Sequence, residues 1–218
     1  ACLRELSRIG ISYQSVGATR GVSTPVRITG PLAGLRLVGG YAPRAGALMD
    51  CRFALAIHRF APIVLRAGFD ELRFSSAYRH TFVAGTRTLS RHPSGLALDV
   101  HELAGPGGLV ANVKRDWIRA PSGPGNCVGH VTENRARRMR QLVCDLEASG
   151  LVQMVLSPES NYAHRDQLHI SGLTPGEHAR RYRYAGGRAS AAVARPAPMT
   201  PPAPPPGVPP PDPPDPDG

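Results

Sequence analysis

The sequence contains almost no lysine, because Lys114 is the single lysine among its 26 basic residues and all the others are arginines. The arginines are scattered, and no aromatic residue interrupts their one short run, which comprises Arg135, Arg137, Arg138 and Arg140. Proteins that bind single-stranded nucleic acid combine basic grooves with aromatic stacking platforms, so we expect no nucleic-acid partner. The formal net charge of +10 then reflects either a compositional bias toward arginine or attraction to another polyanion, such as anionic lipid or a cell-wall polymer.

Membrane-spanning and leader segments are also missing from the sequence. No apolar run approaches the roughly 20 residues that a transmembrane helix needs, so we expect no transmembrane segment. A charged start followed by an apolar stretch, which marks a secretory signal peptide, is absent as well. We therefore interpret the chain, which begins at Ala1, as a mature or trimmed form.

The four cysteines, Cys2, Cys51, Cys127 and Cys144, form no CxxC pair, which argues against a zinc ribbon or a thioredoxin-type site. An even number of widely spaced cysteines suits two disulfides in an oxidising compartment. Of the three possible connectivities we favour Cys2 with Cys51, and Cys127 with Cys144, which would tie a loop to a helix. The alternative is four reduced thiols in a cytosolic protein.

A change in composition divides the chain near Gly186. Residues 1–185 carry the bulky apolar side chains of a folded domain, whereas residues 186–218 are rich in Ala and Pro and end in PPAPPPGVPPPDPPDPDG. Such a segment has little to bury and favours an extended, polyproline-like conformation. We predict a disordered Pro-rich tail over residues 186–218, acting as a passive spacer or as an arm that binds the cell wall or a partner.

The apolar periodicity within residues 1–185 predicts an α+β fold. Residues 46–67 and 132–149 have helical spacing; Pro62 should kink or end the first helix, and Thr132 and Gly150 should cap and stop the second. The segment CLRELSRIG begins another helix, followed by a loop-rich stretch to residue 45. Alternating patterns predict strands over residues 71–79, 96–101, 151–156 and 167–171.

Metal-binding chemistry is indicated first by the segment SRHPSGLALD, which places His92 in a loop and Asp99 on a strand. In an alternating strand, Leu96 and Leu98 face the core, so Asp99 faces the opposite way. Gly95 allows the chain to turn sharply before the strand begins.

A second segment, HRDQLHI, ends in a strand in which Leu168 and Ile170 face the core and His169 does not. If the two strands are neighbours, Asp99 and His169 emerge from the same face, and with His92 they supply two imidazoles and one carboxylate. Such a set leaves a fourth position for water, as in catalytic zinc sites. In a regular strand Asp166 would face away from His169, so it reaches the site only if the chain is still a loop or bulge there.

A third segment, SSAYR, places Arg79 at the end of the preceding strand. An arginine at that position could polarise a substrate carbonyl or stabilise an oxyanion.

These three segments together resemble a known family. The pattern S-x-H-x-x-G-x-A-x-D is similar to that of D-Ala-D-Ala carboxypeptidases and dipeptidases, within the lysostaphin and hedgehog-type zinc peptidase superfamily. The strongest resemblance is to the extensin-like C-terminal domain, which shows a Cys-led helix, S-x-x-x-R, S-x-H-x-x-G-x-A-x-D-V and H-R-D-H-F-H in that order. The resemblance runs from Cys2 to His169 and so covers nearly all of the predicted domain.

The resemblance implies one zinc ion held by His92, Asp99 and His169. It implies that Asp166 is the general base and that Arg79 binds the substrate carbonyl. The implied fold is a small antiparallel sheet with helices on one face and a zinc cleft on the other. The implied substrates are peptides of peptidoglycan, often with D-amino acids at the scissile bond.

Three positions depart from the pattern of the relatives. Asp166 stands where the carboxypeptidases have Glu, Gln167 stands where relatives often have His, and Tyr78 stands where relatives commonly have Cys. The first two departures bear on catalysis and leave open an alternative function, a non-catalytic zinc-containing module that binds the cell wall or another protein.

We expect a secreted or periplasmic zinc peptidase that acts on peptidoglycan peptides. In such an enzyme Ser90 would bond to His92 or to the substrate, and His164 would orient Asp166 or line the pocket. A further alternative is a structural envelope protein whose working part is the Pro-rich tail.

Overall fold

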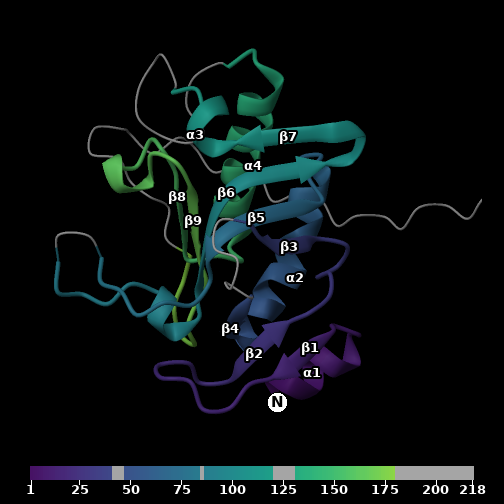
Figure 1. The fold of residues 1–218 in the computed structure, drawn as a ribbon, viewed down its shortest axis with the longest axis vertical. Helices are drawn as coiled ribbons and strands as arrows, with labels where there is room; N and C mark the ends of the chain where they lie inside the picture. The colour runs from purple at the N-terminus through teal and green to yellow at the C-terminus, as the bar shows by residue number, and fades with distance from the viewer. Residues whose placement is uncertain (41–46, 84–85, 120–130, 180–218) are drawn as a thin grey trace, which may run out of the picture. The chain divides into compact units, whose positions relative to one another are not determined.

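Two open β-sheets and four α-helices make up the part of the chain that the computed structural model describes, namely residues 1–40, 47–83, 86–119 and 131–179. Figure 1 shows their arrangement. In chain order the elements are α1 (Cys2–Arg8), β1 (Tyr13–Ser15), β2 (Pro25–Ile28), β3 (Arg36–Gly39), β4 (Leu48–Asp50), α2 (Cys51–Arg66), β5 (Glu71–Ser76), η1 (His92–Ser94), β6 (Ala97–Gly105), η2 (Pro106–Gly108), β7 (Leu109–Asn112), α3 (Val113–Asp116), α4 (Asn134–Ser149), β8 (Met154–Leu156), η3 (Tyr162–His164) and β9 (Leu168–Ser171). The predicted α+β class is confirmed.

The larger sheet is built around β6. Its strands run in the order β3-β5-β6-β9-β8, and β7 pairs with β6 beyond the end of β9. The first half of β6 pairs with β9 and the second half pairs with β7, both antiparallel. One pair departs from the predicted antiparallel sheet, because β3 runs parallel to β5. Its four residues lie at the sheet edge, where a short strand can pair in either direction.

Helices α2 and α4 lie together on one face of this sheet (Figure 1). The apolar stripe predicted for α2 is buried, including Phe53, Ile57 and Phe60. The strands present Leu98, Leu168 and other aliphatic side chains to the same core. The face of the sheet that is predicted to carry Asp99 and His169 is therefore the one that points away from these two helices.

The smaller sheet has the order β1-β2-β4 and lies beside α1 (Figure 1). A disulfide between Cys2 and Cys51 joins the start of α1 to the start of α2 and confirms one of the two predicted pairings. Cys144 lies in α4, but Cys127 lies outside the described residues, so the second pairing stays a prediction.

The helix boundaries differ from the predicted ones for local reasons. The segment expected to be helical from residue 46 first forms β4, and α2 begins only after Asp50, whose side chain accepts a hydrogen bond from the Arg52 N–H. Pro62 does not end this helix, which continues to Arg66. Glu133 rather than Thr132 is the residue that precedes α4, and no side-chain hydrogen bond caps it. Gly150 ends α4 in the left-handed conformation, as predicted.

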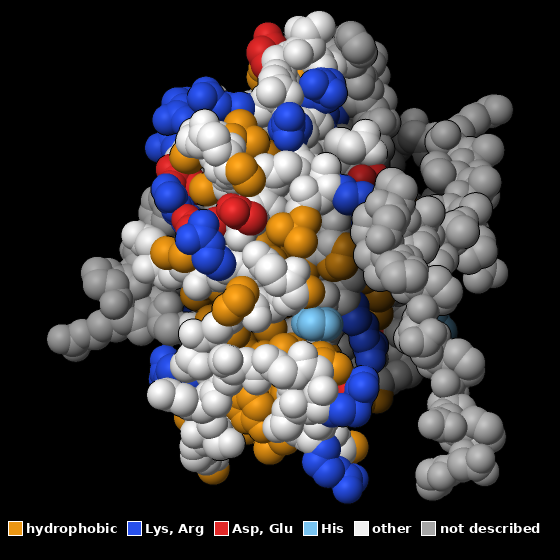
Figure 2. Space-filling model, turned by 90° about the vertical axis from the view of Figure 1, so that its right-hand side faces the viewer, with side chains coloured by type: hydrophobic (Ala, Val, Ile, Leu, Met, Phe, Trp, Pro, Cys, Tyr) orange, Lys and Arg blue, Asp and Glu red, His pale blue; other side chains and the backbone are white. Residues whose placement is uncertain are grey.

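Basic side chains do not form one continuous patch on the face that Figure 2 draws, where they lie in separate groups among acidic and uncharged ones. None of the helices in the described part of the chain is long and apolar enough to cross a membrane. The predicted domain boundary at residue 185 and the Pro-rich tail lie outside the described residues.

Candidate metal centre

Strand pairing places Asp99 beside His169. Asp99 on β6 lies opposite His169 on β9 in the antiparallel register, and paired residues project from the same face of a sheet. Their neighbours Leu98 and Ile170 are also paired and belong to the core. The alternation predicted from the sequence therefore brings a carboxylate and an imidazole together on the side away from α2 and α4.

A tight turn delivers His92 to the same place. His92 begins the 3-10 helix η1, which ends at Gly95 with φ of 64°, a backbone conformation that favours glycine. A Cβ atom on Gly95 would lie 2.6 Å from the backbone N of Asp50, so the turn packs tightly against β4. The Ser90 hydroxyl accepts a hydrogen bond of 3.3 Å from the backbone N–H of His92, which agrees with the predicted bond between these residues.

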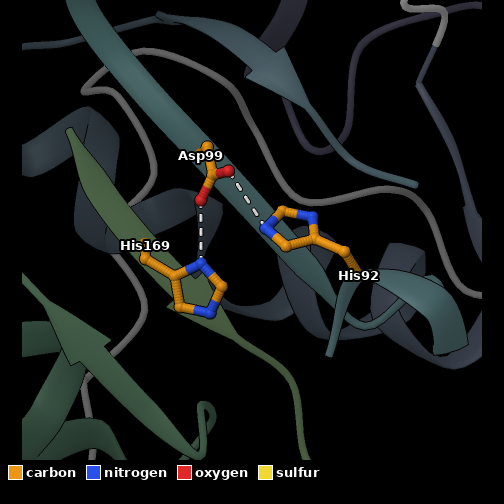
Figure 3. Close-up of side chains that lie close together, drawn as sticks. All are labelled: His92, Asp99 and His169. Carbon is orange, nitrogen blue, oxygen red and sulfur yellow. Dashed lines mark hydrogen bonds and ion pairs between the residues drawn. The ribbon is translucent and has the colours of Figure 1, made fainter. Parts of the chain in front are cut away.

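The three side chains converge in a buried cluster (Figure 3). His169 Nδ1 lies 2.8 Å from Asp99 Oδ1, and His92 Nε2 lies 3.0 Å from Asp99 Oδ2. One ligand atom from each residue lies within 4.8 Å of the other two. Ligand pairs around a tetrahedral zinc are separated by roughly 3.3 Å when each metal–ligand distance is about 2.0–2.1 Å, so small shifts of these side chains would admit an ion.

The hydrogen bonding of His92 shows that this cluster suits a cation. Its Nδ1 lies 3.2 Å from the backbone carbonyl oxygen of Ala77, and a carbonyl only accepts, so Nδ1 carries the proton. In the neutral ring Nε2 then carries a lone pair and no proton. This buried atom lies at ion-pair distance from Asp99 but has no hydrogen-bond partner within the described residues. A lone pair that faces a carboxylate is repelled unless a proton or a metal ion lies between them.

The charge balance of the cluster depends on Asp99. Burial would raise the pKa of Asp99, but its contacts with His169 and His92 outweigh burial and hold that pKa well below its usual range. Asp99 is therefore an anion at neutral pH. A buried carboxylate that stays charged needs cationic partners; Arg79 supplies one, and a metal ion or a protonated imidazole could supply a second.

Arg79 lies beside the cluster and contacts Asp99 directly. Its Nη2 donates a hydrogen bond of 2.8 Å to Asp99 Oδ2, and 51% of its side chain remains exposed. One guanidinium nitrogen thus contacts a metal-ligand candidate, while the exposed part of the fork faces solvent.

Asp166 lies in a turn and not in a regular strand, as the sequence pattern requires if its side chain is to reach the site. The chain forms η3 and two further turn residues before β9 begins at Leu168. His164, in the same turn, has its ring centroid 5.6 Å from that of His169. Burial, together with the charge of His169, lowers the pKa of His164 to about 4, although the charges of Asp99 and Asp166 act in the opposite direction. His164 is therefore neutral at pH 7, and its Nδ1 bonds to Asn161 Oδ1 at 2.7 Å.

One known protein family matches the sequence that builds this site. The family model described as Extensin-like protein C-terminus matches residues 1–182. The chain belongs to this extensin-like family. A search of curated proteins and a search of solved structures each returned no match. The matched region of the extensin-like chain includes every candidate ligand and every described helix and strand.

The contacts of two residues in the extensin-like domain, His101 and Arg91, escaped prediction from the sequence. His101 has no partner at metal-ligand spacing in the sequence, yet its ring lies 2.9 Å from the Asp166 carbonyl oxygen and 2.9 Å from Ser75 Oγ. His101 lies between Val100 and Glu102, where the pairing of β6 with β5 shifts its register, so regular alternation gave no basis for placing its side chain. Arg91, next to His92, forms an ion pair with Glu177, which no local pattern indicated.

Proposed function

We propose that this extensin-like chain is a zinc-dependent peptidase that hydrolyses peptides of peptidoglycan at bonds involving D-amino acids. The observation that carries the proposal is the convergence of His92, Asp99 and His169 in one buried cluster. The substrate class comes from the resemblance of the motifs around these residues to those of D-Ala-D-Ala carboxypeptidases.

The donor set fits zinc. Two imidazoles and one carboxylate are the usual protein ligands of catalytic zinc, which retains a further position for water or substrate. When bound, zinc supplies Lewis acidity toward a carbonyl and lowers the pKa of water. His92 Nε2 is buried without a hydrogen-bond partner in the described structure. A bound metal would satisfy the lone pair of this atom.

The surrounding residues supply proton transfer and orientation. Asp166 takes a proton from the attacking water and returns it to the leaving amine, as a general base and then a general acid. Arg79 has five N–H donors, of which one bonds to Asp99, and the remaining donors can stabilise the oxyanion. His164 is neutral and bonded to Asn161, and the charge of Asp166 acts on its ring, which supports a role for His164 in orienting that carboxylate.

We place the protein in the periplasm or outside the cell, where peptidoglycan is accessible. The disulfide between Cys2 and Cys51 supports this location, because disulfides persist in oxidising compartments and are rare in the cytosol.

Metal analysis and digestion of purified wall peptides test the proposal. The parent protein should hold one zinc per chain and release peptide products that vanish with a chelator. His92→Ala and His169→Ala should lose the zinc, whereas Asp166→Asn should keep it and lose hydrolysis. As a matched control, Asp145→Asn in α4, whose carboxylate accepts a hydrogen bond from Gln141 one turn earlier, should behave like the parent. Hydrolysis by Asp166→Asn at the parental rate would show that the assigned base is wrong.

A second candidate function is a non-catalytic zinc module that binds wall peptides or another protein. The contact of Arg79 with Asp99 favours it, because this arginine is partly committed to the ligand cluster. This module would hold zinc and bind muropeptides without cleaving them, and Asp166→Asn would leave the binding affinity unchanged.

A further inference from the structure

His101 connects three segments that surround the candidate centre. It lies on β6 two residues after Asp99, and it is half-buried. Its Nδ1 is 2.9 Å from the backbone carbonyl oxygen of Asp166, and its Nε2 is 2.9 Å from Ser75 Oγ. Because a carbonyl only accepts, Nδ1 donates to Asp166, and in the neutral ring the Ser75 hydroxyl donates to Nε2.

We propose that His101 is a positioning residue, which holds the turn bearing Asp166 at a fixed place relative to His92, Asp99 and His169. The inference rests on the proposed function to the extent that Asp166 acts as the base. Its structural part, the anchoring of the turn, can be tested without any activity.

The turn needs an anchor because its own hydrogen bonds are local. The backbone N–H groups of His164, Arg165 and Gln167 donate to carbonyls three residues earlier, and the Arg165 guanidinium lies over the Tyr162 ring. These contacts join turn residues to one another and so give the turn its shape. The pairing of Leu168 with Val100 joins the end of the turn to β6, and the bond from His101 extends this connection to residue 166 itself.

The backbone position of residue 166 matters greatly because the side chain there is short. An aspartate has a single methylene between Cα and its carboxyl group, so rotation about few bonds sets where the carboxylate lies. A bond to the Asp166 carbonyl therefore controls the reach of the base. Misplacing a reacting group by about 1 Å can cost on the order of 100-fold in rate.

The second hydrogen bond of His101 joins it to β5, the strand that precedes Arg79 in the chain. Ser75 lies at an irregularity of β5, where the register with β6 shifts between Phe74 and Ser76. Such bulges redirect side chains, and here the hydroxyl meets the imidazole. One ring thus ties together the turn of Asp166, the strand of Asp99 and the strand that ends before Arg79.

Three substitutions separate the two bonds. His101→Asn places an amide N–H near the position of Nδ1, so it keeps the bond to Asp166 and loses the bond to Ser75. His101→Gln reaches the position of Nε2, so it keeps the Ser75 contact and loses the donor to Asp166. His101→Leu removes both with a side chain of similar volume. His58→Gln, at a half-buried histidine of α2, is the control.

We expect every variant to hold one zinc, because His101 is not a ligand. Hydrogen exchange at the amides of residues 164–167 should quicken in His101→Leu and His101→Gln but not in His101→Asn. On muropeptides, kcat should fall roughly 10- to 100-fold in the same two variants with KM little changed, and His101→Asn should retain most of the parental rate.

Parental exchange and kcat in His101→Leu, or an equal loss in His101→Asn, would overturn the inference. If His101→Leu does not fold, the comparison of the Asn and Gln variants decides. If the parent protein shows no chelator-sensitive hydrolysis, the proposed function fails, and hydrogen exchange alone then decides whether His101 anchors the turn.

Discussion

Asp50 shows how one buried carboxylate organises the chain near the candidate centre. Its oxygens accept hydrogen bonds from the backbone N–H groups of Ser23, Thr24 and Arg52 and from the Arg52 guanidinium. Its own backbone N–H donates to the carbonyl of Gly95. Asp50 therefore caps α2 and at the same time holds the turn that carries His92.

The charge of Asp50 should make the stability of the domain depend on pH. Burial raises the pKa of Asp50, but hydrogen bonds from Arg52 and Thr24 lower it by more. In the folded state the pKa of Asp50 therefore lies below its usual value. Its stabilising effect is thus full above the unfolded pKa, about 4, and is lost as the pH falls through the folded value.

Asp50→Asn should therefore lower the free energy of unfolding by roughly 1.5–3 kcal/mol at pH 7, the range for hydrogen bonds to charged groups. The difference from the parent should shrink below about pH 4. Urea unfolding between pH 7 and pH 3 measures it, with Asp145→Asn as the control. A difference that stays constant across this range would contradict the assignment.

Gly95 offers a matched comparison with Gly150. Both have positive φ, 64° and 71°, but a Cβ on Gly95 would meet the backbone of Met49 and Asp50 whereas one on Gly150 would meet nothing within 4 Å. Gly150→Ala should cost about 1–2 kcal/mol of left-handed strain. Gly95→Ala should cost more and should also weaken zinc uptake, because η1 would move with His92. Urea unfolding and zinc titration measure both effects; equal losses in the two variants would contradict this account.

Residue-level prediction from the sequence worked where a regular strand governs direction. The alternation of β6 and β9 correctly put Asp99 and His169 on one face, and the loop before Gly95 supplied His92. The partners of Arg79 and His101 were not predictable, because they depend on the irregularity at Ser75 and on a turn whose path no periodic pattern describes.

At the scale of elements, α2 contains an exposed proline. Pro62 lies within the helix, where its ring removes a backbone hydrogen bond to the carbonyl four residues earlier. Pro62→Ala should raise the free energy of unfolding by about 1–3 kcal/mol, because the bond to His58 can form and helix propensity improves. Thermal or urea unfolding tests this, with the exposed Arg59→Ala expected to change stability by about 0.5 kcal/mol or less. A destabilised Pro62→Ala would indicate that the proline ring makes packing contacts of its own.

The long elements were predicted better than the short ones. The stripes of α2 and α4 extend over several turns, and their apolar side chains indicated their buried faces. Strands β1 to β4 have only three or four residues each, too few for alternation to be distinguished from chance. Their pairing joins segments far apart in the chain, as between β2 and β4 or β3 and β5, and the sequence carries no local signal for it.

At the scale of the whole molecule, the Cys2–Cys51 disulfide closes a sequence separation of 49 residues. A crosslink of this span stabilises mainly by restricting the unfolded chain, by about 2–4 kcal/mol. The double substitution Cys2→Ser with Cys51→Ser should lower the free energy of unfolding by that amount without changing zinc content. Urea unfolding without reductant measures it, and Ser7→Ala on α1 is the control. A loss of zinc would show that α1 supports the centre directly.

Because Asp99 pairs with His169, the candidate centre forms only when β6 and β9 are correctly aligned. Slippage of β9 by one position would bring Leu168 or Ile170 opposite Asp99, and would expose aliphatic side chains on the polar face while burying an imidazole among the helices. A misaligned chain would thus lack both a sound interior and a complete set of donors. The ability to capture a metal ion would therefore report that the chain has reached its native topology.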